Sequence, residues 1–167
     1  EIDQSCTNAM IAVEKILKSN ISEDSIQYWL ADVVQFHRFQ PLTNSYEVLK
    51  TQGLDNLSDK KLSFLLGRYY DDGAQRAIKA LWDIENSFNM DWVPILREYI
   101  VDFQFGKVVI LSDMDVVLTG SGRNLLILNK DNYKAGGRRV QDVLEVLNEL
   151  IMLIENNLAG TPSTSIH

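Results

Sequence analysis

Cysteine and histidine are almost absent from this sequence, which has one cysteine, Cys6, and two histidines, His37 and His167. One cysteine excludes an internal disulfide framework, and together with two histidines it excludes a zinc ribbon or a multi-histidine metal site within one chain. Because Cys6 falls at helical spacing with apolar neighbours, we interpret it as a small core residue rather than as a nucleophile. The cysteine content leaves the redox compartment open.

Long apolar runs are also missing. No stretch approaches the roughly 18 consecutive apolar residues that a membrane-spanning helix needs, and no signal peptide opens the chain. The first residue is Glu rather than Met, so the lack of a leader in this sequence carries no conclusion about the full-length protein.

Basic residues are outnumbered by acidic ones, 16 against 23, which gives a formal net charge of -7. Binding to a phosphate backbone needs clustered Lys and Arg, and the only dense basic spot here is Lys134 with Arg138 and Arg139. A spot this short is typical of a solvated helix end. We therefore expect no nucleic-acid partner.

The composition that remains is that of one globular helical domain. The chain has 167 residues, of which 46% are hydrophobic, enough to bury a core without cross-links. We predict an all-α fold, a single-domain antiparallel bundle of about five to seven helices. Its helical domain is expected over residues 1–158, followed by a flexible polar tail over 159–167.

Apolar residues recur at helical spacing along most of the chain. The helices that this spacing predicts are 6–19, 21–39, 43–53, 57–88, 91–103 and 138–158. Pro41 is expected to stop the second of them. Gly67 and Gly73 each cost about 1 kcal/mol relative to Ala inside a helix, so the fourth is expected to kink or break near residues 71–73.

Capping residues mark several of the predicted helix starts. The predicted N-caps are Ser22, Asn44, Ser58 and Asp91. Glu47 stands three residues after Asn44, which is the spacing of a capping box, and Ile21 with Ile26 would form a hydrophobic staple. Gly53 is expected to take the left-handed conformation after the third helix.

The stretch "VVILSDMDVVLTGSG", residues 108–122, resembles the nucleophile strand of haloacid-dehalogenase-like phosphatases. The resemblance implies that Asp113 is a covalent nucleophile, Asp115 the general acid/base, and Mg²⁺ the cofactor. Val116 departs from the pattern, in which Gly commonly follows the second Asp. Such a site also needs a doubly wound parallel sheet, and no alternation of strands and helices precedes Val108.

The alternative interpretation of the same stretch is structural. Asp113 or Ser112 then caps a short helix from Met114 to Leu118, which Gly120 closes, and a second short helix covers residues 121–134. We favour this interpretation, and we allow for a short irregular or strand-like segment near residues 106–119.

Other candidate sites are incomplete. Residues 129–134 begin like a calcium loop but lack its later ligands, and Glu145 with Glu149 lacks the Glu-x-x-His pairs of a di-iron bundle. His37 is interpreted as a residue at the edge of the core. We assign no catalytic, cofactor-binding or metal-ligating residue and expect no cofactor.

Aromatic side chains leave two interpretations open. The aromatic residues concerned are Trp29, Trp82, Trp92, Tyr69 and Tyr70. They either line a ligand pocket between helices or pack into the core, and their helical periodicity favours packing.

The segment from Phe39 to Tyr70 resembles a family of bacterial proteins of unknown function, typical of the Bacteroidota. The resemblance covers about a fifth of the chain. The matching positions are Phe39, Pro41, Ser45, Tyr46, Glu47, Leu49, Lys50, Gly53, Ser58, Tyr69 and Tyr70. Members of this family carry one transmembrane helix near the N-terminus, followed by a helical domain of about this size.

The resemblance implies that this chain is the part of a single-pass membrane protein that follows an N-terminal anchor. The positive-inside rule then places the domain in the periplasm, with a cytoplasmic location as the alternative. We expect a non-enzymatic domain with a sensory or assembly role that binds a protein partner or a small ligand, and that meets the membrane only through its anchor. The alternative function is the magnesium-dependent phosphatase that would use Asp113 and Asp115.

Overall fold

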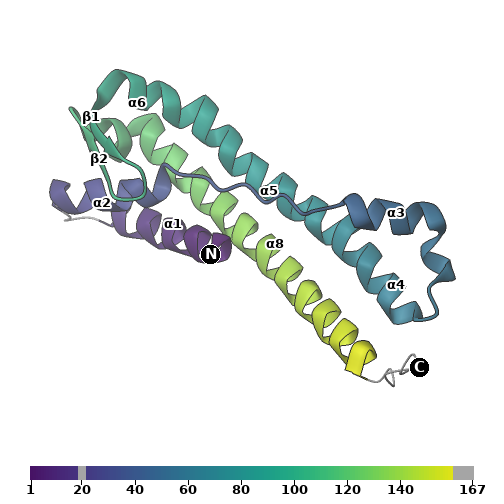
Figure 1. The fold of residues 1–167 in the computed structure, drawn as a ribbon. Coiled ribbons are helices and arrows are strands. Elements are labelled where there is room, and N and C mark those ends of the chain that lie inside the picture. Colours follow the sequence, from purple (N-terminus) through teal and green to yellow (C-terminus); the bar gives the residue numbers. More distant parts are fainter. Residues whose placement is uncertain (19–21, 160–167) are drawn as a thin grey trace.

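Two long helical rods run antiparallel through the molecule in this computed structural model, which describes residues 1–18 and 22–159 (Figure 1). The first rod is continuous through α4 (Lys60–Gly67), the π-helical η2 (Arg68–Gly73), α5 (Ala74–Ser87), the π-helical η3 (Phe88–Trp92) and α6 (Val93–Tyr99). The second rod is α8 (Gly120–Ala159), a single helix of 40 residues. An ion pair of 3.2 Å between Lys61 Nζ and Glu149 Oε1 joins α4 to the second half of α8.

Shorter helices complete the fold. They are α1 (Ile2–Ile16), α2 (Glu23–Val33), α3 (Asn44–Gln52) with the 3₁₀ turn η1 (Leu54–Asn56), and α7 (Asp115–Leu118). Counted with each rod as one helix, the described residues form six helices and one two-stranded sheet. The prediction of an all-α fold with a small strand-like segment is confirmed.

The larger of two hydrophobic cores lies where α1 and α2 pack on the first half of α8 and on α5. Its largest fully buried side chains include Leu30, Trp92, Val117 and Leu126. The smaller core joins α4, η2 and α5 to the second half of α8. Its buried members are Leu65, Tyr69, Ala77, Val143, Val146 and Leu150.

The sequence predicted two separate helices, over 121–134 and 138–158. This separation is wrong, because α8 runs without interruption through Gly136 and Gly137. These glycines allow other helices to come close. A Cβ on Gly136 would lie 2.9 Å from Ile84 Cδ1, and one on Gly137 would lie 3.3 Å from Cys6 Cβ. Burial of α1 and α5 against the glycines therefore outweighs their low helix propensity.

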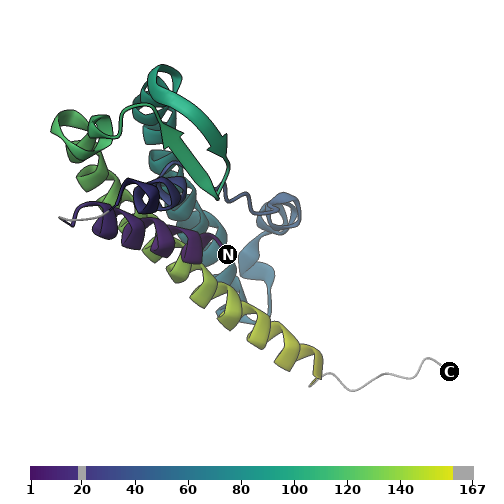
Figure 2. The ribbon, with the colours of Figure 1, turned by 90° about the vertical axis from the view of Figure 1, so that its left-hand side faces the viewer.

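The predicted helix over 91–103 is also wrong in its boundaries. The rod continues through Asp91 and ends at Tyr99, and β1 (Ile100–Gln104) then pairs antiparallel with β2 (Val108–Leu111), as Figure 2 shows. The turn between the strands places Gly106 at φ 65°, and Lys107 N–H donates to the Gln104 carbonyl at 2.9 Å. Because β2 packs against α2, tertiary contact supports the hairpin.

The second predicted helix ends earlier than expected, at Val33 rather than near Phe39. Val34 leaves the helical region with φ -89° and ψ 48°, and the Tyr133 hydroxyl donates a hydrogen bond to the Val33 carbonyl. This contact satisfies a carbonyl that the end of the helix leaves unpaired. Residues 35–43 form no helix or strand and run as an extended coil beside α5 (Figure 1).

Several predicted helix ends shift by one residue. Ser22 is the N-cap of α2 as predicted, whereas the N-caps of α3 and α4 are Thr43 and Asp59. Asp59 accepts hydrogen bonds from the N–H groups of Lys61 and Leu62. Ile21 and residues 160–167 lie outside the described residues, so the predicted staple and most of the predicted tail are not covered by the structure.

The backbone conformation tests two predictions about glycine, one at Gly53 and one near Gly73. Gly53 was predicted to be left-handed; its φ of 90° is positive as expected, whereas its ψ of 105° lies outside the left-handed helical region. The predicted break near residues 71–73 takes the form of the π-helical turn η2 within a continuous rod.

Among the described residues, no helix combines the length and the apolar character that crossing a membrane requires.

Candidate functional site

Asp113 and Asp115, the two candidate phosphatase residues, follow β2 of the antiparallel hairpin and are exposed. Asp113 Oδ1 accepts the backbone N–H of Asp115 at 2.9 Å at the start of α7. A short helix is therefore present as predicted, but its N-cap is Met114, and neither Asp113 nor Ser112 holds the capping position. The only sheet in the described residues is this hairpin, so the parallel sheet that supports the phosphatase chemistry is not among them.

The remaining candidate residues are spread apart. Within residues 1–18 and 22–159, no three His, Cys, Asp or Glu side chains are grouped closely enough to hold a metal ion. His37 is half-buried at the edge of the core. Cys6 is buried, and burial raises the pKa of its thiol to about 11, with a smaller contribution from Asp3. A thiol with so high a pKa is a poor nucleophile near neutral pH.

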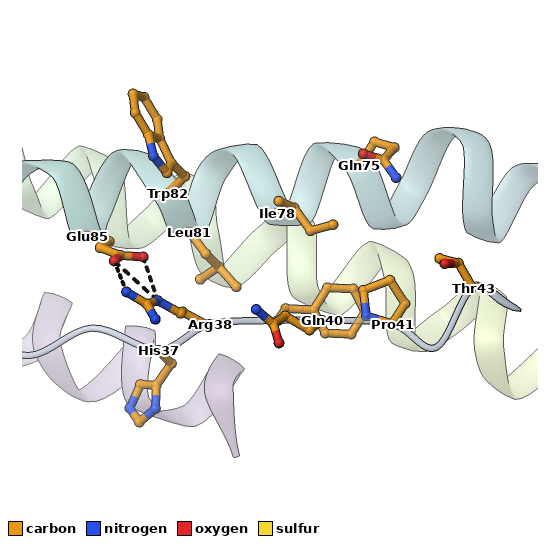
Figure 3. Close-up of a pocket in the computed structure, with 11 residues that line it drawn as sticks. His37, Arg38, Gln40, Pro41, Thr43, Gln75, Ile78, Leu81, Trp82 and Glu85 are labelled. Atoms are coloured by element: carbon orange, nitrogen blue, oxygen red, sulfur yellow. Dashed lines mark hydrogen bonds and ion pairs between the residues drawn. The ribbon is translucent and has the colours of Figure 1, made fainter.

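A groove of about 460 Å³ lies between residues 37–43 and α5, as Figure 3 shows. Leu81 and Glu85 point from α5 toward the extended segment, whereas Trp82 points away from it. The groove is lined by His37, Arg38, Phe39, Gln40, Pro41, Thr43, Gln75, Ile78, Leu81, Trp82 and Glu85. Its lining combines apolar and polar side chains, and we refer to it as the 37–43 groove.

The amphipathic pattern of α5 builds one wall of this groove. Ala74, Ala77, Leu81 and Ile84 are buried at helical spacing. Ile78 and Glu85 lie on the neighbouring stripe of the helix, which is only partly covered by the extended segment. The wall therefore presents apolar carbon beside a carboxylate.

An ion pair fixes the extended segment to α5. Arg38 Nε donates to both carboxylate oxygens of Glu85, at 3.2 and 3.0 Å, and Arg38 Nη2 also donates to Oε1. The side chain of Glu85 is 17% exposed and that of Arg38 is 63% exposed. The hydrogen bonds from Arg38 lower the pKa of Glu85 below its ordinary value, so the carboxylate is ionised at neutral pH.

The extended segment is also anchored beyond the groove. After the groove the chain enters α3, where the Tyr46 hydroxyl donates to Asp71 Oδ2 at 2.5 Å and Lys50 Nζ donates to Asp71 Oδ1 at 2.8 Å. The rings of Tyr46 and Tyr70 stack at 4.4 Å. Hydrogen bonds from Lys50 and Tyr46 lower the pKa of Asp71, and burial raises that of Tyr46. These contacts attach α3 to the π-helical turn and set the path of residues 35–43.

The backbone of the extended segment is unpaired. No backbone N–H or carbonyl of residues 35–42 is hydrogen bonded to another backbone group in the part of the chain that the structure describes. Apart from Pro41, which has no N–H, each of these residues therefore offers a backbone donor and a backbone acceptor.

Trp82 departs from the packing interpretation of the aromatic residues. Trp92 is 1% exposed and Tyr69 is 8% exposed, whereas Trp82 is 56% exposed. The sequence contained a signal for this difference, because Trp82 lies off the stripe that Leu81 and Ile84 form on α5. The extended segment beside α5 had no such signal, since residues 35–39 fit a longer second helix.

Comparison of the chain with protein-family models, with curated proteins and with solved structures finds no match to any of them.

Proposed function

We propose that this protein is a non-enzymatic binding domain whose 37–43 groove holds an extended segment of a protein partner. The observation that carries the proposal is the unpaired backbone of residues 35–42 beside an exposed tryptophan. An extended peptide pairs its own backbone with such a row and places alternate side chains into the adjoining groove.

The size and lining of the groove support this occupant. Its volume of about 460 Å³ falls within the range of about 300–1,000 Å³ that is usual for binding sites. Trp82 and Ile78 offer apolar surface to a side chain of the peptide, while Gln75 and Thr43 offer hydrogen-bonding groups. Because tryptophan is among the most frequent energetic anchors of protein interfaces, we assign Trp82 that role.

The proposal includes a tether to the membrane. Its support is the resemblance of residues 39–70 to a family of membrane-anchored proteins, and the domain would then present its groove in the periplasm for an assembly or sensory role. Fractionation of cells that express the full-length protein tests this part. Recovery in the cytosolic fraction would contradict the tether and leave the groove proposal standing.

Selection from a displayed library of random peptides tests the groove. Trp82→Ala is expected to weaken the affinity of the selected peptides by about tenfold or more, because it removes the apolar anchor. Fluorescence anisotropy gives the affinities, and NMR shift mapping is expected to place the peptide at residues 37–43 and α5.

Phe64→Ala is the matched control, because Phe64 is 66% exposed on α4 of the same rod and does not line the groove. It is expected to leave the affinity unchanged. Selected peptides that bind Trp82→Ala as tightly as the wild type would contradict the proposal, and so would a library that yields no binder.

A further inference from the structure

The outer edge of β1 is open to solvent. β1 pairs with β2 on one side, and no further strand of the described residues lies on its other side. All five residues of β1 are exposed, whereas those of β2 alternate between half-buried and buried. Figure 2 shows the hairpin at the top of the molecule, away from the long rod of α8. An unpaired strand edge of this kind is a template on which another strand can pair.

Apolar side chains gather along this edge. Val101 is 65% exposed and Phe103 is 39% exposed, and Phe105, which directly follows the strand, is 58% exposed. The rings of Phe103 and Phe105 meet edge to face with centroids 6.4 Å apart. Proteins commonly protect a free edge with Lys or Pro, and residues 100–105 contain neither. Pairing at this edge would therefore remove apolar surface from water.

The single charge of the edge is Asp102. Its Oδ1 accepts the backbone N–H of Phe103 at 2.8 Å, which satisfies that donor in the isolated chain. A second strand that pairs here replaces this acceptor with a backbone carbonyl and frees the carboxylate for another donor. The register of the second strand decides which side chain faces the carboxylate.

The sequence of the edge is complementary to itself about Phe103. When two identical strands pair antiparallel about a two-fold axis, residues equally far from the central residue lie opposite each other. With Phe103 at the centre, Val101 lies opposite Phe105, and Asp102 lies opposite Gln104. Aromatic pairs and pairs of an aromatic with a β-branched residue stabilise a sheet, and an amide can donate to a carboxylate. With Asp102 at the centre, two carboxylates would oppose each other, which is destabilising.

We propose that a second copy of this chain pairs with the outer edge of β1, antiparallel and centred on Phe103, so that two hairpins form one four-stranded sheet. A sheet of three or more strands with an apolar face is more stable than a two-stranded one. The self-complementary register favours a second copy, because each side chain from 101 to 105 then has a compatible partner. No residue of the hairpin lines the 37–43 groove, so this proposal does not depend on the function proposed there.

Sedimentation velocity over a range of protein concentrations tests the pairing. We expect a reversible equilibrium between monomer and dimer. Hydrogen exchange is expected to show amides 101–105 more protected at high protein concentration than at low concentration. A protein that stays monomeric up to about 1 mM would overturn the proposal, because a specific contact weaker than this is negligible.

Two lysine variants of the same strand test the register. Val101→Lys removes the apolar partner of Phe105 and is expected to weaken the dimer at least about tenfold. Gln104→Lys places an ammonium opposite Asp102 of the second copy and is expected to strengthen the dimer by about threefold or more. Both variants add the same charge, so an effect of net charge alone would shift the two dissociation constants in the same direction. Shifts in the same direction would contradict the register.

Phe64→Lys is the matched control, because Phe64 is 66% exposed on α4, far from the hairpin (Figure 1). It is expected to leave the dissociation constant close to that of the wild type, and circular dichroism checks the fold of each variant. A dimer that survives Val101→Lys, or that Phe64→Lys disrupts equally, would place the interface elsewhere. Flotation of a monomer with phosphatidylcholine vesicles, abolished by Val101→Lys, would replace the second copy by a lipid surface.

Discussion

Glu85 is a half-buried carboxylate on α5 that hydrogen bonds join to Arg38 of the extended segment. The two residues are 47 positions apart in the chain, so their pairing holds only while the segment lies against the helix. The side chain of Glu85 is 17% exposed, so its carboxylate is partly shielded from water. Arg38 therefore offsets a desolvation cost that an exposed carboxylate would not have.

Glu85→Gln is expected to lower the free energy of unfolding at pH 7. Because the pKa of Glu85 is lowered in the folded state, its contribution is fully present above the unfolded value of about 4.5. That contribution is lost as the pH falls through the lower folded pKa. Urea unfolding between pH 7 and pH 3 is therefore expected to show the difference between wild type and variant shrinking.

The matched control for this titration is Glu155→Gln, an exposed carboxylate on α8 that makes no ion pair among the described residues. It is expected to change the stability little at any of these pH values. A difference between wild type and Glu85→Gln that stays constant down to pH 3 would show that the charge of Glu85 does not stabilise the fold.

At the scale of the helices, the start of α8 is set by a close approach to α7. A Cβ on Gly122 would lie 1.9 Å from the carbonyl oxygen of Val116 and 2.8 Å from Val117 Cα. Both neighbours are backbone atoms, which no rotamer change can move. The Gly120-Ser121-Gly122 sequence thus serves helix packing, and Gly122 is the residue that the contact requires.

Gly122→Ala is expected to destabilise the protein although Ala has the higher helix propensity. The propensity gain is about 1 kcal/mol, whereas overpacking costs about 1–3 kcal/mol or more and here falls on backbone. Thermal unfolding followed by circular dichroism measures whether the cost of overpacking exceeds the gain in helix propensity. Ser121→Ala changes an exposed neighbour and is expected to have little effect, and a Gly122→Ala variant as stable as the wild type would contradict the close approach.

On the scale of the whole molecule, the two ends of the fold differ in the size of their hydrophobic core, and we call them the thick end and the thin end. The thick end contains α1, α2, the hairpin and the first half of α8 around the larger core. The thin end contains α3, α4 and the second half of α8 around the smaller one. A smaller core buries less apolar surface, so the thin end is expected to open at a lower free energy.

Hydrogen exchange measured by mass spectrometry tests this expectation. Amides of residues 60–67 and 143–159 are expected to exchange faster than those of residues 9–16 and 122–136, which lie in helices packed around the larger core. Equal protection at both ends would show that the molecule opens as one unit and would contradict the division.

Much of the helical content follows from local patterns alone. The apolar stripe of α5, the positive φ of Gly53 and the hydrogen bond from the Asp115 N–H to Asp113 all depend on residues within a few positions of each other. For the same reason the all-α class could be predicted. The N-cap of α4 shifted by one residue, because Ser58 and Asp59 are both good N-caps and it is Asp59 that accepts the N–H groups of Lys61 and Leu62.

Contacts between residues far apart in the chain decided where α2 ends, why α8 is continuous and why the hairpin forms. Tyr133 meets the Val33 carbonyl across 100 positions, and Gly136 is kept helical by contacts with Ile84 and Cys6. The 37–43 groove depends on the same contacts, since the segment would otherwise continue as helix. Local periodicity determines which residues can form a helix, whereas burial against other helices determines where each helix stops and which side chains, such as Trp82, remain exposed.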